Sequence, residues 1–251
     1  MTSGYIDDSP RGYLLLTFLL LDARKVQIID EKYGRHSISF EVVGTTLDIN
    51  GDIHDSGRMQ QDINLNDDEI SWIKKHGIRC SLAIPSKAPG NYYVRVAVRD
   101  KTSGKIGSAY RFIEIPDLNK GALALSSIFT ANPVESASTN KPGGAGNFQI
   151  YHAGETLNCT VFVYNAKGAK PELESQFVMF RNEDEVYRSE PEPIDLNNVG
   201  NVRKILLTKS IHLKKTLESG NYILQLIVKD KQAGKNGALA TQTLDLEILA
   251  N

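Results

Sequence analysis

The segment that decides the fold lies at residues 90–107 and reads GNYYVRVAVRDKTSGKIG. It returns without gaps at residues 220–237 as GNYILQLIVKDKQAGKNG, with half of the aligned positions identical. Self-similarity of this kind indicates a repeated structural unit. The positions that we expect to define the motif are Gly90, Tyr92, Asp100, Gly104 and Gly107 in the first copy and Gly220, Tyr222, Asp230, Gly234 and Gly237 in the second.

The pattern inside the motif predicts the last hairpin of a β-sandwich. After each Gly-Asn-Tyr, large apolar residues recur at every second position, which is the period of a strand with one buried face. The polar stretch from Asp100 to Gly107 holds two glycines, which suit the positive φ of a hairpin loop. Tyr92 and Tyr222 resemble a tyrosine corner, in which the hydroxyl binds nearby backbone. The motif therefore predicts a structural role for these residues.

The rest of the chain fits short strands and one helix. The apolar run YLLLTFLLL at residues 13–21 predicts a buried strand. Residues 37–49 alternate and precede Asn50-Gly51, which predicts a two-residue type I′ turn. Asn66 is placed to cap a short helix that Gly77 ends. In the second half we expect strands at residues 156–164, 174–181 and 202–208.

These elements predict an all-β fold of two tandem Ig-like or fibronectin-like β-sandwiches, with the short helix in the first. We place the first domain at residues 1–117 and the second at residues 118–251. Residues 118–146 are expected to form a linker or an extended loop. Cys80 and Cys159 then fall in different domains, and we expect both to be buried free thiols.

The charge balance narrows the range of partners. The 29 Lys and Arg residues against 30 Asp and Glu residues give a formal net charge of −1. Nucleic acid is not an expected partner, because phosphate binding needs a concentrated positive field. The apolar run is far shorter than the roughly 20 residues of a membrane-spanning helix and follows acidic residues. We therefore expect neither membrane insertion nor a signal peptide within this sequence.

The motifs of common enzyme chemistries do not occur in the sequence. The five histidines are scattered, no HExxH or CxxC spacing exists, and there is no GxSxG elbow, P-loop or GxGxxG turn. Residues 48–55 resemble a calcium loop, but Gly51 is its fourth residue, whereas an EF-hand loop needs glycine at the sixth. We predict no catalytic residues, no cofactor, no metal and no enzyme. A pair of carboxylates at glycosidase spacing stays open, because that spacing is three-dimensional.

Taken together, these segments resemble the C-terminal β-rich region of the von Willebrand factor A-related proteins of Acidobacteria. The residues that carry the resemblance are PGNYYVRVAVRDKTSGKIGSA from Pro89, IEIPDL from Ile113, LALSS from Leu123, GETLNCTVFVYNA from Gly154, ESQFVMFRNEDEVY from Glu174 and GNYILQLIVKDK from Gly220. The resemblance implies β-rich modules of an exported or cell-envelope protein. The DxSxS metal motif of the A domain is absent here, so metal-dependent adhesion is not implied.

The function that we expect is a non-catalytic structural or interaction module, extracellular or in the cell envelope, that binds a protein partner or itself. Edge strands of sandwiches permit such assembly. The alternative is a carbohydrate-binding module, in which exposed aromatic residues such as Tyr93 or Tyr151 would stack on sugar rings. Tyrosines on strands also serve in cross-strand packing, which is the simpler interpretation of both.

Overall fold

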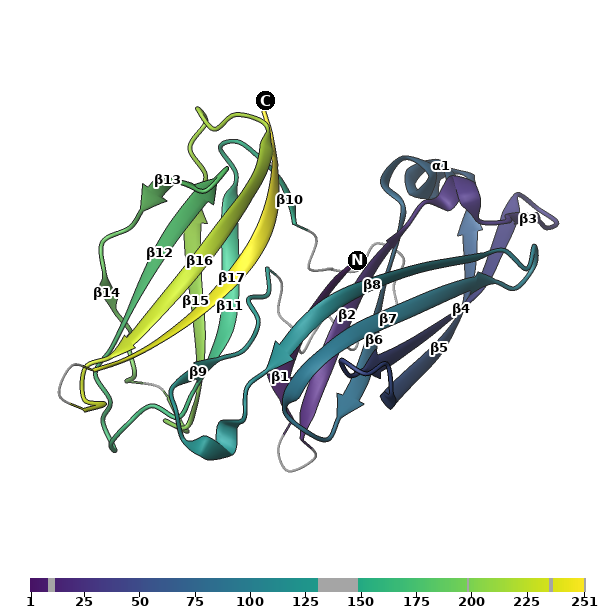
Figure 1. Cartoon of the computed structure of the whole chain (residues 1–251). Coiled ribbons are helices and arrows are strands. Elements are labelled where there is room, and N and C mark those ends of the chain that lie inside the picture. The colour runs from purple at the N-terminus through teal and green to yellow at the C-terminus, as the bar shows by residue number, and fades with distance from the viewer. Residues whose placement is uncertain (9–11, 131–148, 198, 235–236, 251) are drawn as a thin grey trace. The chain divides into compact units, whose positions relative to one another are not determined.

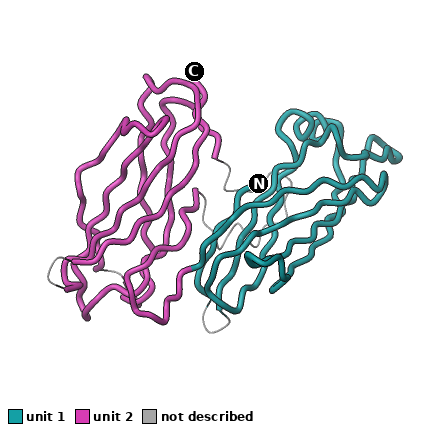
Figure 2. Tube along the Cα trace, in the orientation of Figure 1, with its two compact units in different colours: residues 1–115, 133–146 teal, residues 116–132, 147–251 magenta. Residues whose placement is uncertain are grey.

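The computed structural model describes residues 1–8, 12–130, 149–197, 199–234 and 237–250 of the 251-residue chain. The described chain consists of β-strands with one α-helix and divides into two compact units (Figures 1 and 2). Unit 1 comprises Met1–Ile115, and unit 2 comprises the described residues from Pro116 onward. The predicted all-β class, with a short helix in the first domain, is confirmed.

Unit 1 is a sandwich of two sheets (Figure 1). The smaller sheet has the strand order β1-β2-β6, and the larger has the order β3-β4-β7-β8 with β5 also paired to β4. All of these pairs are antiparallel. The elements are β1 Thr2–Asp7, β2 Tyr13–Leu21, η1 Ala23–Lys25, β3 Ile29–Asp30, β4 Arg35–Leu47, β5 Ile53–Asn66, α1 Asp67–His76, β6 Ile78–Ser86, β7 Gly90–Asp100 and β8 Ile106–Ile115.

The helix α1 forms as its sequence predicts. The Asn66 side chain accepts a hydrogen bond from the Glu69 N–H at 2.9 Å, and the Glu69 carboxylate accepts one from the Asn66 N–H at 2.9 Å. This reciprocal capping box satisfies two amides that the first turn leaves without helical partners. Ile70 and Ile73 are buried, and the helix ends at Gly77 with φ of 77°. The predicted buried strand at Tyr13–Leu21 is also confirmed as β2.

The predicted two-residue turn at Asn50-Gly51 is wrong. Strand β4 ends at Leu47 and β5 begins at Ile53, so the connection is longer. The Asp48 carboxylate accepts hydrogen bonds from the N–H groups of Asn50 and Asp52 at 2.8 and 3.0 Å. An aspartate that binds backbone in this way stabilises its own turn, and only Gly51 of the dipeptide has a positive φ.

Unit 2 is a second sandwich with the same arrangement of strands around its hairpin. Its smaller sheet has the order β15-β11-β9, and its larger sheet has the order β10-β17-β16-β12-β13 with β14 also paired to β12. The elements are η2 Leu118–Lys120, β9 Ala124–Leu125, β10 Ile150–His152, β11 Thr156–Tyr164, β12 Leu173–Arg181, β13 Asp184–Arg188, β14 Glu192–Pro193, β15 Lys204–His212, β16 Gly220–Asp230 and β17 Ala238–Leu249.

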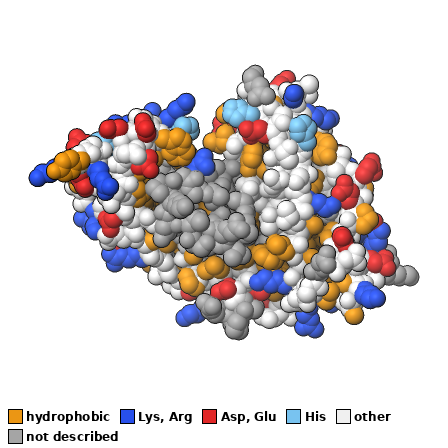
Figure 3. Space-filling model, turned by 180° about the vertical axis from the view of Figure 1, so that it is seen from behind, with side chains coloured by type: hydrophobic (Ala, Val, Ile, Leu, Met, Phe, Trp, Pro, Cys, Tyr) orange, Lys and Arg blue, Asp and Glu red, His pale blue; other side chains and the backbone are white. Residues whose placement is uncertain are grey.

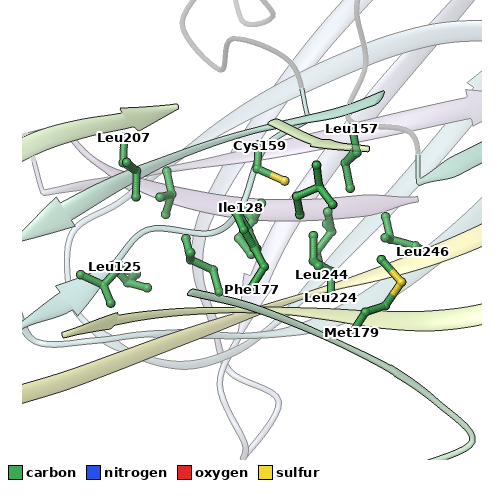
Figure 4. Packing of buried hydrophobic residues seen from close by; sticks show 14 of the residues in the cluster. Leu125, Ile128, Leu157, Cys159, Phe177, Met179, Leu207, Leu224, Leu244 and Leu246 are labelled. Atoms are coloured by element: carbon green, nitrogen blue, oxygen red, sulfur yellow. The ribbon is translucent and has the colours of Figure 1, made fainter. Parts of the chain in front are cut away.

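The core of unit 2 takes in part of the segment predicted to be a linker or loop. Strand β9 pairs with β11, and Leu125, Ile128 and Phe129 are buried. Figure 4 shows Leu125 and Ile128 among core side chains such as Cys159 and Phe177. Residues 118–130 therefore belong to the sandwich, whereas residues 131–146 of the predicted segment lie outside the described residues.

Candidate functional site

Each hairpin contains a tyrosine corner. The Tyr222 hydroxyl donates a hydrogen bond to the Glu218 carbonyl at 2.9 Å, and the Tyr92 hydroxyl lies 3.2 Å from the Ala88 carbonyl. Both rings are buried. Gly90 and Gly220, which precede them, have φ of 151° and 152°, a range that side chains disfavour. These four motif residues fix the entry of the chain into β7 and β16.

The motif aspartates join each hairpin loop to a distant segment. Asp100 is 5% exposed and accepts hydrogen bonds from the N–H groups of Thr102 and Ser103, from the Ser103 hydroxyl, and from the Gln27 N–H at 2.7 Å. Asp230 is fully buried and accepts from the N–H groups of Gln232 and Lys167, the latter at 2.7 Å. The partners Gln27 and Lys167 were not predictable, since each contributes only a backbone amide.

The environment of Asp100 also shifts its acidity. Burial raises the pKa of its carboxyl group, but the hydrogen bonds from Gln27, Ser103 and Thr102 together outweigh that effect. The pKa of Asp100 is therefore below its ordinary value. A buried carboxylate held in this way serves as a structural anion.

Of the two pairs of aligned loop glycines, one pair shares its backbone conformation and the other does not. Gly104 and Gly234 both have positive φ, at 73° and 80°, as the motif predicts. Gly237 also has a positive φ of 76°, whereas Gly107 lies inside β8 opposite Val98 and outside the left-handed region. The predicted turn role of Gly107 is wrong, because the first loop is shorter. Arg99 already pairs with Ile106, while Lys229 pairs with Leu239.

An aromatic row lies on the outer face of β7 and β8 in unit 1. We define it as Tyr93, Tyr110 and Phe112, which are 42%, 74% and 50% exposed. Tyr93 pairs with Phe112 across the strands, at 5.6 Å between ring centroids, and lies 6.4 Å from Tyr110. The Arg95 side chain, paired with Tyr110, lies on the same face. Tyr151, the other predicted platform residue, is instead half-buried against the core of unit 2.

Unit 2 carries different residues at the places of the aromatic row. Its β16–β17 register puts Ile223 opposite Asp245, where unit 1 has Tyr93 opposite Phe112. Thr243 takes the place of Tyr110, by the same register. Since both hairpins share one scaffold, the aromatic side chains are not required to form it. Sequence reasoning missed Tyr110 and Phe112, because their face depends on the register of β8.

A groove opens within unit 1, between the end of β2 and the start of β8. Its volume is about 540 Å³, and its lining is mostly apolar. Strand β1 pairs with β2 from Asp7 opposite Tyr13 to Thr2 opposite Phe18, on the edge of β2 that corresponds to the β9 edge of β11. Leu20 is 45% exposed. Met1 lines the groove, together with residues of the two sheets that include Leu19, Leu21, Val96, Val98, Gly107 and Ala109.

The corresponding place in unit 2 is filled by that unit's own chain. In β9, Leu125 pairs with Val163 and Ala124 with Tyr164, the last two residues of β11. Leu125, Val163 and Tyr164 are all at most 3% exposed. The next residue, Ser126, donates its N–H to the Phe162 carbonyl at 2.8 Å.

The opposite wall shows the same contrast. The side-chain amide of Gln242, in β17, donates to the Ser126 carbonyl at 3.4 Å, so the β9 segment reaches both sheets. Ala240, opposite Val228, is 8% exposed. Gly107 takes the corresponding place opposite Val98 in unit 1, and it is exposed. The groove of unit 1 thus lies beside the end of β2, where Met1 also lines it, whereas β9 fills the corresponding place in unit 2.

The thiols and histidines form no reactive cluster in the part of the chain that the structure describes. Cys80 and Cys159 are free, as expected, but only Cys159 is buried, whereas Cys80 is half-buried. Burial raises the pKa of each thiol to about 12, so neither is a ready nucleophile. His36 bridges Asp67 and Asp30 at 2.8 Å each, and these hydrogen bonds raise its pKa. No group of three or more His, Cys, Asp or Glu side chains among the described residues could hold a metal ion.

The described surface mixes charges of both signs. On the face seen in Figure 3, Lys and Arg side chains are interspersed with Asp and Glu, as the net charge of −1 leads one to expect. Within the described residues, no helix has the length and apolar character needed to cross a membrane.

Two sheets in each of two units define the chain as a tandem β-sandwich protein. No known family and no curated protein matches the sequence. Among solved structures, a CARDB domain from Pyrococcus furiosus, described in complex with di-metal ions, is 12% identical, covering 52% of this chain and 93% of that domain with a TM-score of 0.26. A tetra-tandem repeat from the extending region of a large adhesion protein is 12% identical, covering 94% of this chain and 50% of that one with a TM-score of 0.29. Red sea bream transglutaminase is 8% identical, with 95% and 29% coverage and a TM-score of 0.29. The chain spans half or less of the last two, and these likenesses carry no functional argument.

Proposed function

We propose that this chain is a non-catalytic structural and interaction module that self-associates through the aromatic row of unit 1. The observation that carries the proposal is the replacement of this row by Ile223, Thr243 and Asp245 in the sister hairpin. A scaffold that forms with either set does not need the aromatic one. Exposed aromatic side chains gathered on one surface are enriched at protein interfaces.

The geometry of the rings favours a protein contact over a sugar platform. Tyr93 meets Tyr110 at an interplanar angle of 63° and Phe112 at 67°. Rings set edge to face present an uneven surface, whereas stacking on a sugar chain needs faces that lie flat. Arg95 beside them supplies a cation that can lie over an aromatic ring of a second copy. Tyr and Arg are also the residues most often found at the energetic centre of protein interfaces.

The proposed location is the cell envelope or the exterior of a bacterial cell. It rests on the sequence resemblance to von Willebrand factor A-related proteins. Fractionation of the source cells with an antibody against the chain tests it. We expect the protein in the envelope fraction or the medium, and recovery with the cytoplasmic proteins would contradict the proposed location.

Sedimentation equilibrium tests the proposed self-association. The double variant Tyr110→Thr/Phe112→Asp gives unit 1 the outer residues of unit 2. We expect the wild-type chain to show a concentration-dependent increase in mass and the double variant to remain monomeric with an unchanged circular dichroism spectrum. A wild-type chain that stays monomeric at high concentration contradicts the proposal, as does equal association of both proteins. Binding of the wild type to a glycan array would instead support the carbohydrate alternative.

A further inference from the structure

We propose that the aromatic row of unit 1 contacts an isoleucine face on unit 2 of a second copy, so that copies of the chain associate head to tail. The inference rests on the proposed self-association and names the surface that receives the aromatic row. We define the isoleucine face as Ile150, Ile223 and Glu247, on the outer side of the larger sheet of unit 2. Each copy then carries both halves of the contact, one on each unit.

The isoleucine face combines exposed apolar side chains with an acid. Ile150, in β10, pairs with Glu247 of β17, and Ile223, in β16, pairs with Asp245, two residues before Glu247. Alternate residues of a strand point to the same side of a sheet, so these side chains share the outer side. Ile150 and Ile223 are 50% and 45% exposed. Glu247 is exposed, and its side chain forms no ion pair with another described residue.

Arg95 supplies the opposite charge beside the aromatic row. It pairs with Tyr110 across the strands and lies two residues after Tyr93 in β7, on the same outer side. Arg95 is exposed, and it too has no ion-pair partner in the described part of the chain. A cation beside aromatic rings matches an acid beside isoleucines, because apolar contacts surround the ion pair that the two charges form. Charge pairs of this kind select one partner surface over others.

The charges around the two surfaces favour a head-to-tail contact over a two-fold contact. The outer sides of β7 and β8 carry two basic residues and one acid, whereas those of β16 and β17 carry one basic residue and two acids. These residues are Arg95, Arg99 and Glu114 in unit 1 and Lys229, Asp245 and Glu247 in unit 2. A two-fold contact joins a surface to itself, so it brings two surfaces with excess positive charge together. A head-to-tail contact joins surfaces of opposite charge.

Glu114 and Glu247 are matched residues that distinguish the two modes of association. Glu114 pairs with Asn91 and Glu247 pairs with Asn221, at the same place in the sister hairpins, and both glutamates are exposed. In a two-fold contact between aromatic rows, Glu114 is the acid on the outer side of β8 that is available to Arg95 of the second copy. In a head-to-tail contact, Glu247 has that role. Variants at the two positions therefore separate the modes.

Sedimentation velocity of mixed variants of the full chain tests the proposal. Tyr110→Thr/Phe112→Asp removes the aromatic row, and Glu247→Arg reverses the charge of the isoleucine face. We expect each variant alone to be monomeric at concentrations at which the wild type associates. An equimolar mixture of the two should form a dimer and nothing larger, because one intact aromatic row can meet one intact isoleucine face. A mixture that stays monomeric would overturn the head-to-tail contact.

Charge reversal then tests the pair of residues. Arg95→Glu should weaken association at least tenfold, and the added change Glu247→Arg should restore it. The matched control Glu114→Arg should associate at least as tightly as the wild type and should not restore association to Arg95→Glu.

The failure of this inference differs from the failure of the proposed function. If Glu247→Arg associates as the wild type does and Glu114→Arg does not, the aromatic rows meet each other. Self-association then stands, and the head-to-tail contact is overturned. A wild-type chain that stays monomeric at high concentration would contradict the proposed self-association itself, and the head-to-tail contact with it.

Discussion

Unit 1 and unit 2 share a hairpin with the same tyrosine corner, the same buried aspartate and a similar order of strands, yet they differ on both sides of its second strand. In unit 2 the inner side is closed by β9 and the outer side carries Thr243 and Asp245. In unit 1 the inner side is an open groove and the outer side carries Tyr110 and Phe112. The duplication thus separates residues that build the sandwich from residues that are free to serve another purpose.

The largest expected effect comes from the residue that closes unit 2. Leu125→Ala should lower the free energy of unfolding by about 3 kcal/mol, because it leaves a cavity in the core. Leu20→Ala, on the uncovered end of β2, should cost less than about 1 kcal/mol, since that side chain is 45% exposed.

Urea denaturation followed by two signals checks this pair. Trp72, the single tryptophan, reports on unit 1 by fluorescence, whereas circular dichroism reports on all strands. Leu125→Ala should shift the circular dichroism transition and leave the Trp72 transition in place. Equal costs for the two variants would show that β9 does not close unit 2 as described.

The next effect concerns the buried aspartates. Asp100→Ala and Asp230→Ala should each cost about 2 kcal/mol, because backbone amides lose their acceptor. The first should cost more, since Asp100 also accepts from the Ser103 hydroxyl. Thermal unfolding at neutral pH compares the two variants. If either variant lost almost no free energy of unfolding, its aspartate would not stabilise the fold as described.

The lowered pKa of Asp100 adds a dependence on pH. The folded-state pKa lies below the unfolded value of about 3.9, so the carboxylate contributes its full stability above that pH. The contribution is lost as the pH falls through the folded-state pKa. Asp100→Asn should therefore make the unfolding midpoint less sensitive to acid below about pH 4. A variant whose midpoint falls with acid as steeply as that of the wild type would contradict this.

A smaller effect distinguishes two glycines that the sequence repeat aligns. Gly237→Ala should cost about 1–2 kcal/mol, because φ is 76° and the new Cβ would lie 2.8 Å from the Asp230 carbonyl oxygen. Gly107→Ala should be neutral or stabilising by about 0.5 kcal/mol, because the residue lies in a strand with open space beside it. Thermal unfolding of the two variants checks this difference. If both midpoints moved in the same direction, the two glycines would have the same role, and the first loop would not be shorter than the second.

The smallest effect tests the element that the units share most closely. Tyr92→Phe and Tyr222→Phe should each cost about 1 kcal/mol, the net value of one hydrogen bond. Tyr222→Phe should cost at least as much, since its bond is 2.9 Å long against 3.2 Å for Tyr92. Chemical denaturation measures both, and a large difference between them would mean that the corners are not equivalent.

Local patterns predicted the parts of the fold that are decided locally. Alternation gave the strands, and Asn66 with Glu69 gave the start of the helix. The turn at Asn50-Gly51 was missed because the Asp48 carboxylate organises a longer loop. Strand β9 was missed because two residues show no period, and pairing with β11 alone makes them a strand.

The candidate site was less predictable than the fold. Tyr93 stood out as an exposed aromatic residue, but its neighbours Tyr110 and Phe112 join it only through the register of β8. The groove is lined by residues from β2, β7 and β8 and by Met1, and only the folded chain brings these residues together. Comparison of the two copies in three dimensions provides the signal that their aligned sequences do not.

Thiol labelling tests most directly whether unit 1 is open where unit 2 is closed. Gly107→Cys and Ala240→Cys place a thiol at matching positions, opposite Val98 and Val228. The native Cys80 and Cys159 give little background, because burial raises the pKa of each to about 12. Under native conditions, Gly107→Cys should react with a thiol reagent at least tenfold faster than Ala240→Cys. Equal rates for the two variants would contradict an open groove in unit 1.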